Sequence, residues 1–510
     1  MPRFLQPSSP PGLLKKSVSH LPISQPQYNA LAKYAPAINR LTAGLAVVSA
    51  YLQTFTRHLR RLARRHSLSL RLFVLVAAIC ILEPLVYSFY LHRVSPPPHD
   101  LDAPFQVGCA DPLAAATAYP REKAALVMLA RNAELDNVIA TAQNIDVQFN
   151  RWFNYPLVLL NDEPFTDDFV ARVTASLPAN RTIRFETIPS SHWGFPSHIS
   201  SQTARGWMAD LDRQGVFHGG EESYHHMCRF YSGTFFTLPA LKDYRWYWRL
   251  EPGVQYTCAI TYDPFAAMAR HGKVYGFTTA LWEVPETCPS LFREVDAFAH
   301  DYDIPQGVNW DALLDMESGL FGIGPPVLWK RWLAARRGDA HWTKGGDRWN
   351  LCHYWSNFEI ADLNFFRGEQ YQALFRYLDE KGGFYRERWG DAPVHSLAVH
   401  LLLPPEKLHH FADFGYLHEP FYQCPGNAPN GQLRHSKELG LWEEGNYSEE
   451  MEGSIGCRCL CKEERRRNLS GYCLEKLQAP AAARRMSWWD RQQNRFPYSI
   501  GMPGRKGEEI

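Results

Sequence analysis

The sequence predicts an α/β fold in which helices cover both faces of a central sheet. Two apolar runs, at residues 124–130 (AALVMLA) and 155–160 (YPLVLL), have the length and composition of buried strands, and a third candidate strand lies at 182–188. A segment with helical periodicity follows the first run and passes through Leu135 and Val138. Strands that alternate with helices are typical of sheets buried on both faces.

Polar residues follow the first two strands. Arg131 and Asn132 come directly after residues 124–130, and Asn161 and Asp162 end the second strand. In open α/β sheets ligands bind at the carboxyl ends of the strands. We therefore expect Arg131, Asn132 and Asp162 to lie near a bound nucleotide.

Further elements continue this pattern toward the C-terminus. Residues 244–250 (YRWYWRL) alternate aromatic and basic side chains, and Glu251 then stands at the end of the predicted strand. Later segments indicate an element at 274–279, helices around 319–334 and over 357–367, and a loop at 382–391.

The N-terminal part predicts a membrane anchor. Residues 1–71 contain many Lys and Arg but no Asp or Glu, and the apolar run 72–91 follows them. About 20 apolar residues span a bilayer core, and basic residues before the span keep the N-terminus in the cytosol. Glu83 and Pro84 lie in the middle of the run, where both are unfavourable. A buried core helix is the alternative, and a cleaved signal peptide fits less well because the run starts far from Met1.

These patterns divide the chain into five parts. We expect a basic cytosolic arm (1–71), a transmembrane signal anchor (72–92), a stem (93–118), a catalytic domain (119–425) and a cysteine-bearing tail (426–510). In this type II topology everything after the anchor is lumenal. Three Asn-x-Ser/Thr glycosylation acceptors, Asn180, Asn446 and Asn468, fall on that side.

The cysteines favour the same compartment. Of 11 cysteines, Cys80 lies in the predicted anchor and the other ten follow it, an even number that permits complete pairing without revealing the partners. Cys457, Cys459 and Cys461 form a cluster that suits zinc or disulfides. An oxidising lumen favours disulfides.

Two carboxylates and a histidine are candidates for chemistry. Glu251 precedes Pro252, which favours an extended backbone that presents the Glu251 side chain as a metal ligand, with His418 as a second ligand. An isolated glutamate is also often simply solvated or paired with a base. Glu359 follows the aromatic run 352–358, so it is a candidate desolvated acid, base or nucleophile, or else a carboxylate at a helix start.

Other candidates are basic and aromatic. Arg229 and Tyr231 suit phosphate and sugar binding, with ordinary packing as the alternative. Asp391 closes a cluster with Arg386 and Arg388 whose role stays open. The formal charge of +1 gives no reason to expect nucleic acid as a partner. ATPase, zincin and α/β-hydrolase motifs are absent from the sequence.

Seven segments together resemble the fungal Golgi α-1,2-mannosyltransferases of glycosyltransferase family 15. They occur in the family order and cover roughly residues 119–425. The segments are Leu-Ala-Arg-Asn (129 to 132), Leu-Asn-Asp-Glu-Pro-Phe (160 to 165), Met-Cys-Arg-Phe-Tyr-Ser-Gly (227 to 233), Tyr-Trp-Arg-Leu-Glu-Pro-Gly-Val (247 to 254), Trp-Ser-Asn-Phe-Glu-Ile (355 to 360), the run GGFYRERWGDAPVHS (382 to 396) and Gly-Tyr-Leu-His (415 to 418).

The resemblance implies a GT-A-like fold with a mixed central sheet, GDP-mannose as donor and Mn2+ as cofactor. It puts Glu251 and His418 in the place of the metal ligands, Glu359 in that of the proposed nucleophile and Tyr224 in the sugar pocket. The acceptor implied is the 2-hydroxyl of an α-mannoside on a glycoprotein O- or N-glycan. A Golgi scaffold or lectin-like relative of the same fold is the alternative, and the oligomeric state is open.

The resemblance also implies retention of configuration at the anomeric carbon. Two routes give retention: two displacements through a mannosyl-enzyme at Glu359, or same-face attack in which the leaving diphosphate deprotonates the acceptor. One departure from the family pattern touches the expected sugar contacts. His225 stands where the family run has an arginine.

Overall fold

The computed structural model describes residues 72–79, 81–82, 102–314, 327–429, 447–461 and 471–478. The chain separates into two units, Met1–Pro84 and Leu85–Ile510. In the first unit, residues 72–79 and 81–82 are helical. Within the described residues no helix has both the length and the apolar character needed to cross a bilayer. Glu83, Pro84 and the rest of the predicted anchor lie outside the described residues, so the anchor stays a prediction.

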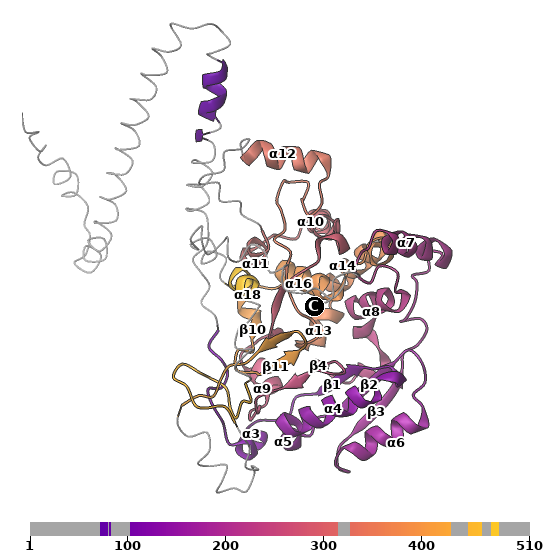
Figure 1. Ribbon diagram of the computed structural model, residues 1–510, viewed down its shortest axis with the longest axis vertical. Coiled ribbons are helices and arrows are strands. Elements are labelled where there is room, and N and C mark those ends of the chain that lie inside the picture. The colour runs from indigo at the N-terminus through magenta and orange to yellow at the C-terminus, as the bar shows by residue number, and fades with distance from the viewer. Residues whose placement is uncertain are drawn as a thin grey trace, which may run out of the picture. The chain divides into compact units, whose positions relative to one another are not determined.

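A mixed seven-stranded sheet forms the centre of the second unit, in the order β10-β6-β9-β4-β1-β2-β3 (Figure 1). Only β9 runs antiparallel to its neighbours, β4 and β6, whereas the other pairs are parallel. The prediction of an α/β fold with a mixed central sheet is confirmed. The strands are β1 (Ala124–Leu129), β2 (Leu157–Asn161), β3 (Ile183–Thr187), β4 (Trp246–Leu250), β6 (Tyr275–Phe277), β9 (Glu359–Asp362) and β10 (Leu408–His410).

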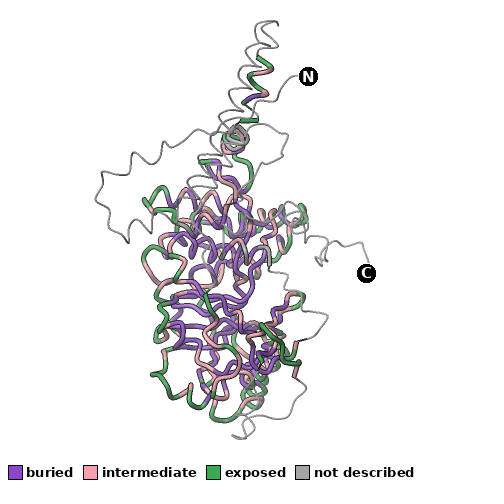
Figure 2. Tube along the Cα trace, turned by 90° about the vertical axis from the view of Figure 1, so that its left-hand side faces the viewer, coloured by how far each residue is buried: buried purple, intermediate pink, exposed green. Residues whose placement is uncertain are grey.

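Helices cover both faces of this sheet. Alternate residues of β1 enter two different cores, Ala125 and Val127 one of them, Leu126 and Met128 the other. Figure 1 shows α4 and α6 on one side of the sheet and α8, α14 and α16 on the other. The helices are α3 (Pro112–Ala118), α4 (Leu135–Ile145), α5 (Arg151–Phe153), α6 (Asp167–Ser176), α7 (Ser201–Arg213), α8 (Glu222–Ser232), α9 (Pro264–Arg270), α10 (Leu291–Asp301), α11 (Val308–Ala312), α12 (Val327–Arg337), α13 (Leu363–Arg367), α14 (Glu369–Lys381), α15 (Gly383–Arg386), α16 (Asp391–Leu402) and α18 (Gly471–Gln478). Buried residues fill the space between these layers, and exposed residues lie at the periphery (Figure 2).

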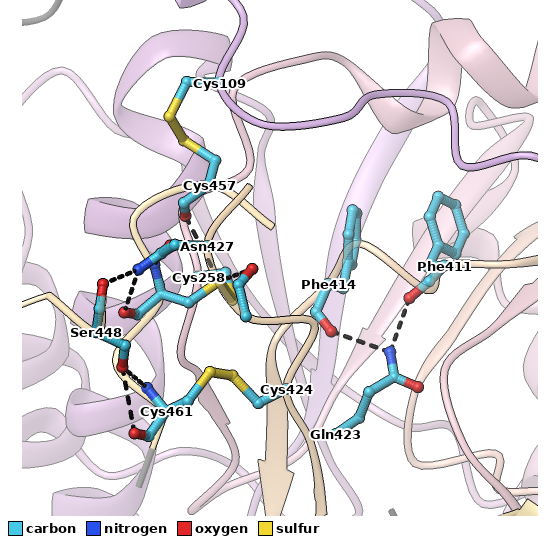
Figure 3. The surroundings of a disulfide bond; sticks show 12 residues. Cys109, Cys258, Phe411, Phe414, Gln423, Cys424, Asn427, Ser448, Cys457 and Cys461 are labelled. Atoms are coloured by element: carbon cyan, nitrogen blue, oxygen red, sulfur yellow. Dashed lines mark hydrogen bonds between the residues drawn. A yellow bond between two sulfur atoms is a disulfide. The ribbon is translucent and has the colours of Figure 1, made fainter. Parts of the chain in front are cut away.

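Two small sheets extend the domain. One contains β5 (Gln255–Tyr256), β11 (Tyr416–His418) and β12 (Phe421–Gln423), with β11 in the middle and antiparallel to both neighbours. The other pairs β7 (Ala280–Trp282) with β8 (Cys352–Tyr354). Gln423 holds the end of β12 by donating to the carbonyls of Phe411 and Phe414 (Figure 3).

Disulfides fasten the segments beyond β12 to the domain. The three clustered cysteines pair with cysteines elsewhere in the chain, as Cys109–Cys457, Cys258–Cys459 and Cys424–Cys461 (Figure 3). A fourth disulfide, Cys352–Cys473, ties α18 to β8. The expectation of disulfides is confirmed, and zinc at the cluster is wrong because its sulfur atoms are already bonded. Cys228 and Cys288 are buried thiols.

The helix predicted over 357–367 is wrong in its first half. Residues Glu359–Asp362 form β9, because their backbone completes the hydrogen bonding of both β4 and β6. The helical periodicity starts only after Asp362, whose side chain accepts from the backbone N–H of Asn364 and begins α13. Pairing between strands thus overrides local propensity. The loop predicted over 382–391 contains the short helix α15.

Candidate functional site

A buried arginine gathers acidic residues at the end of β4. The Arg249 guanidinium donates to Glu251 Oε1 at 2.6 Å and to Asp391 Oδ2 at 2.5 Å, and its Nη1 lies 4.0 Å from Glu359 Oε1. Side chains of a strand alternate between its faces, and Pro252 keeps the preceding residue extended, so Arg249 and Glu251 share one face. One fixed cation therefore serves three carboxylates.

Glu359 is fully buried, and both of its oxygens accept hydrogen bonds. It opens β9 directly opposite Arg249 in the sheet register. The Tyr247 hydroxyl donates to Oε2 at 2.5 Å, and His395 Nδ1 lies 2.8 Å from Oε1. The alternative of a carboxylate at a helix start is wrong, because Glu359 begins a strand.

Both ring nitrogens of His395 lie within hydrogen-bond distance of an oxygen atom. Its Nε2 lies 2.9 Å from the backbone carbonyl of Tyr231, and its Nδ1 faces the Glu359 carboxylate. A carbonyl and a carboxylate only accept hydrogen bonds, so both ring nitrogens donate. Burial lowers the pKa of His395, but the charge of Glu359 and the hydrogen bond to it outweigh burial and raise this pKa. The hydrogen-bond geometry and the raised pKa both favour the protonated form of His395.

Asp391 joins this network from the first turn of α16. It is buried and accepts from Ser356 Oγ at 2.7 Å as well as from Arg249. Burial raises the pKa of Asp391, but the charges of Arg249 and His395 prevail and hold it below the usual value. Asp391 is therefore an anion at the N-terminus of a helix, where the helix dipole also favours negative charge.

His418 lies on β11, next to the turn that precedes Glu359. Its ring stacks on Trp355, with the ring centroids 5.0 Å apart, and its Nδ1 contacts the Asn357 amide. In the antiparallel pairing of β11 with β5, Leu417 lies opposite Gln255. If this register is continued by one residue, His418 lies opposite Val254, which is three residues after Glu251 in the sequence. The fold thus places three segments side by side: the chain after Glu251, strand β11 with His418, and the turn that leads into Glu359.

The predicted sugar-binding tyrosines lie beside this network. Tyr231 is buried, the Arg249 guanidinium lies 3.5 Å from its ring centroid, and its hydroxyl has no hydrogen-bond partner within the described residues. Tyr224 is half-buried, stacks on His218 at 4.2 Å and has the Arg388 guanidinium 5.3 Å from its ring centroid. Their hydroxyls are groups of the kind that bind sugar hydroxyls.

Arg229 and His225 are held by protein contacts. Arg229 makes a two-pronged ion pair with Asp379, at 2.7 and 2.8 Å, and donates to the Gly194 carbonyl. The buried His225 lies between the carbonyls of Gly219 and Phe384. Both side chains therefore connect elements of the domain, which agrees with the packing alternative for Arg229.

Arg131, Asn132 and Asp162 lie at the carboxyl ends of β1 and β2. Arg131 is exposed and pairs with Glu134, a hydrogen bond that raises the Arg131 pKa, and the charge of Asp162 raises it further. The Asn132 side chain donates to the Pro164 carbonyl and accepts from the backbone of the loop after β2. Asn132 thereby joins the two strand-end loops.

Sequence reasoning missed four members of the network: Arg249, His395, Tyr247 and Ser356. Arg249 carried a usable signal, because an arginine inside an otherwise aromatic, buried strand must find anionic partners. His395 sits similarly in the apolar helix α16. Neither signal reveals which carboxylate is the partner, since these residues are far apart in sequence.

Comparison with known proteins identifies the family. The profile of a family described as glycolipid 2-alpha-mannosyltransferase matches residues 106–432. The O-glycoside alpha-1,2-mannosyltransferase homolog 4 of Schizosaccharomyces pombe is 38% identical over 384 residues, which cover 72% of this chain and 86% of that protein. The chain belongs to glycosyltransferase family 15. The resemblance in the seven sequence segments is thereby confirmed.

Two solved structures of fungal enzymes share the fold. Core-mannan synthase A from Aspergillus fumigatus, in its Mn/GDP form, is 36% identical, with a TM-score of 0.54 over 66% of this chain and 84% of that one. The mannosyltransferase Ktr4p from S. cerevisiae in complex with GDP is 34% identical, with a TM-score of 0.55 over 69% and 83% of the two chains. This chain therefore shares its mixed α/β fold with these two fungal enzymes.

Proposed function

We propose that this chain is a retaining α-1,2-mannosyltransferase that moves mannose from GDP-mannose to the 2-hydroxyl of an α-mannoside on a protein O- or N-glycan. The description of the matching family and the S. pombe relative support the linkage, and the two GDP-bound relatives support the donor. The observation that carries the proposal is the buried charge network of Arg249, Glu251, Glu359 and Asp391, set at the end of the sheet where α/β folds bind ligands.

Mn2+ is the cofactor that we propose, with Glu251 and His418 as its protein ligands. Carboxylate and imidazole are ligands that suit manganese. Arg249 donates to Glu251 Oε1, whereas Oε2 accepts no hydrogen bond in the part of the chain that the structure describes, which leaves an anionic oxygen for the metal. A bound divalent ion supplies positive charge to the leaving diphosphate.

Glu359 serves, in our proposal, as a fixed negative charge near the reacting sugar. A nucleophile must touch the anomeric carbon, but Glu359 is fully buried and both oxygens are held by donors. Its burial favours the same-face route of the two that give retention. In this scheme Tyr247 and His395 keep the carboxylate in place, and the half-buried Tyr224 contacts a sugar hydroxyl.

We also propose that the chain resides in the Golgi membrane, as a single-pass type II protein with a lumenal catalytic domain. The basic arm and apolar run at the N-terminus support this topology, and the disulfides support an oxidising compartment. Protease treatment of intact Golgi vesicles should leave the domain undigested until detergent is added. Digestion without detergent would contradict the topology.

The activity is tested with the full-length protein in detergent, GDP-mannose, MnCl2 and methyl α-mannoside. We expect GDP release and a dimannoside whose new linkage is α-1,2, identified by proton NMR. A β-linked product, or mannose on another hydroxyl, would overturn the proposal. GDP binding without any product would favour the scaffold or lectin-like alternative.

A further inference from the structure

One short turn contacts both Asp391, which belongs to the charge network around Arg249, and His418, the proposed metal ligand. Residues 355–358 connect β8 to β9, and the Phe358 N–H closes the turn on the Trp355 carbonyl. Trp355 stacks on His418, Asn357 contacts His418 Nδ1, and Ser356 donates to Asp391. The tight turn and the stacking together restrict how the His418 ring can rotate.

The orientation of the Asn357 amide decides which nitrogen of His418 is free. If Asn357 Nδ2 donates to His418 Nδ1, a neutral ring carries its proton on Nε2, and Nε2 has no lone pair for a cation. If the amide is turned by 180° about its last bond, Oδ1 accepts from Nδ1–H and the Nε2 lone pair is free. The oxygen and nitrogen of an amide occupy nearly the same space, so both orientations fit the same heavy atoms.

Among the described residues, no donor holds the Asn357 Oδ1 atom in its present place, and Asn357 is buried. The contact with His418 is therefore the polar interaction that distinguishes the two amide atoms. A histidine that binds a metal typically donates its other N–H to an oxygen, which fixes the ring and strengthens the ligand.

We propose that Asn357 is a positioning residue whose Oδ1 accepts from His418 Nδ1–H and thereby directs the Nε2 lone pair to the divalent cation. The inference rests on the proposed function in taking His418 as a metal ligand. Asn357 itself does not touch the cation. Its contribution is to hold the ring in one tautomer and one rotation, so that binding of the ion requires no rearrangement.

Mn2+ affinity measures this role without turnover. Free Mn2+ is followed by its EPR signal while the full-length protein is titrated in the presence of saturating GDP. We expect Asn357→Leu, which removes the acceptor, to weaken Mn2+ binding by about 10- to 100-fold. Asn357→Asp keeps an oxygen that can only accept, so it should bind Mn2+ within about threefold of wild type or more tightly.

Asn350 provides the matched control. It is also a buried asparagine, and its side chain donates to the Ala312 carbonyl and accepts from the backbone of Cys352. Asn350→Leu should lower thermal stability but leave Mn2+ affinity within about twofold of wild type. Equal loss of affinity in Asn350→Leu and Asn357→Leu would mean general destabilisation and would overturn the proposal.

The outcomes separate the two proposals. If wild type binds Mn2+ and His418→Ala does not, the metal site stands. Unchanged affinity in Asn357→Leu, or a loss in Asn357→Asp as large as that in Asn357→Leu, then refutes the role of Asn357 alone. If wild type itself does not bind Mn2+ with GDP, the proposed cofactor fails. Should Asn357→Leu not fold, the Asn357→Asp titration decides, because a loss beyond about tenfold contradicts an acceptor role.

Discussion

We expect that removing one partner of the ion pair between His395 and Glu359 strongly lowers the free energy of unfolding of this domain. The pair is completely buried, joined at 2.8 Å, and His395 also donates to the Tyr231 carbonyl at 2.9 Å. Removing one partner of a buried pair leaves an uncompensated charge and typically costs about 3–5 kcal/mol. We therefore expect His395→Leu to lower the free energy of unfolding by about 3–5 kcal/mol.

Replacing both partners should be much less harmful than the two single changes suggest. In Glu359→Leu together with His395→Leu, both charges leave and two apolar groups fill the space, an exchange that is often close to neutral. The double change removes the charged pair but still leaves the Tyr247 hydroxyl and the Tyr231 carbonyl unpaired, at about 1–3 kcal/mol each. The double variant should thus lose clearly less than the sum of the single losses.

A double-mutant cycle measures this coupling. Guanidinium unfolding of the four proteins, with disulfides intact, is followed by tryptophan fluorescence and by circular dichroism, and coincident transitions establish that unfolding is two-state. The coupling energy between His395 and Glu359 should exceed about 1 kcal/mol. Additivity within about 0.5 kcal/mol, the value for independent sites, would refute the ion pair.

Three further predictions use the same network. The folded-state pKa of His395 is raised above its ordinary value of 6.5, so its stabilisation is fully present below pH 6.5 and is lost as pH rises through the folded pKa. The difference in unfolding free energy between wild type and His395→Leu should accordingly shrink at alkaline pH, and a constant difference from pH 6 to 10 would contradict this. Glu359→Gln keeps the shape but removes the charge, so kcat should fall by about 10²–10³ with a smaller change in KM, measured by GDP release. Arg249→Gln leaves Glu251 and Asp391 without their shared cation and should lower both thermal stability and kcat, whereas Arg245→Gln, a partly exposed arginine of the same segment, should change kcat by less than about threefold.

The sequence predicted a structural feature correctly where the residues of one short segment were enough to indicate it. The apolar run of β1 predicted a buried strand, because parallel strands are buried on both faces. The role of the polar pair that follows it, Arg131 and Asn132, in binding a nucleotide stays a prediction. The clustered cysteines likewise indicated disulfides. Their partners, Cys109, Cys258 and Cys424, could not be chosen in advance, since pairing depends on which loops meet in space.

Where a residue's role depends on the sheet register, the sequence alone was insufficient. The run before Glu359 reads as the start of a helix, and only the pairing of β9 with β4 places the residue opposite Arg249. The same pairing explains why the carboxylate is buried and why it needs His395, which arrives from a different helix. Local patterns therefore located the candidate carboxylates, while their charge states depend on partners that only the fold supplies.

The turn at 355–358 links Asp391 and the charge network to His418, so we expect a change in one to affect the other. Ser356 is bound to the Asp391 end of the charge network, and its neighbour Asn357 is bound to His418. Since both contacts come from adjacent residues of one closed turn, a shift of the Asp391 and Arg249 pair moves the group that orients His418. Ser356→Ala, which breaks only the first contact, should therefore weaken Mn2+ binding in the EPR titration, by less than Asn357→Leu does. If Ser356→Ala binds Mn2+ as wild type does, the charge network and His418 respond independently, and the turn is merely a shared support.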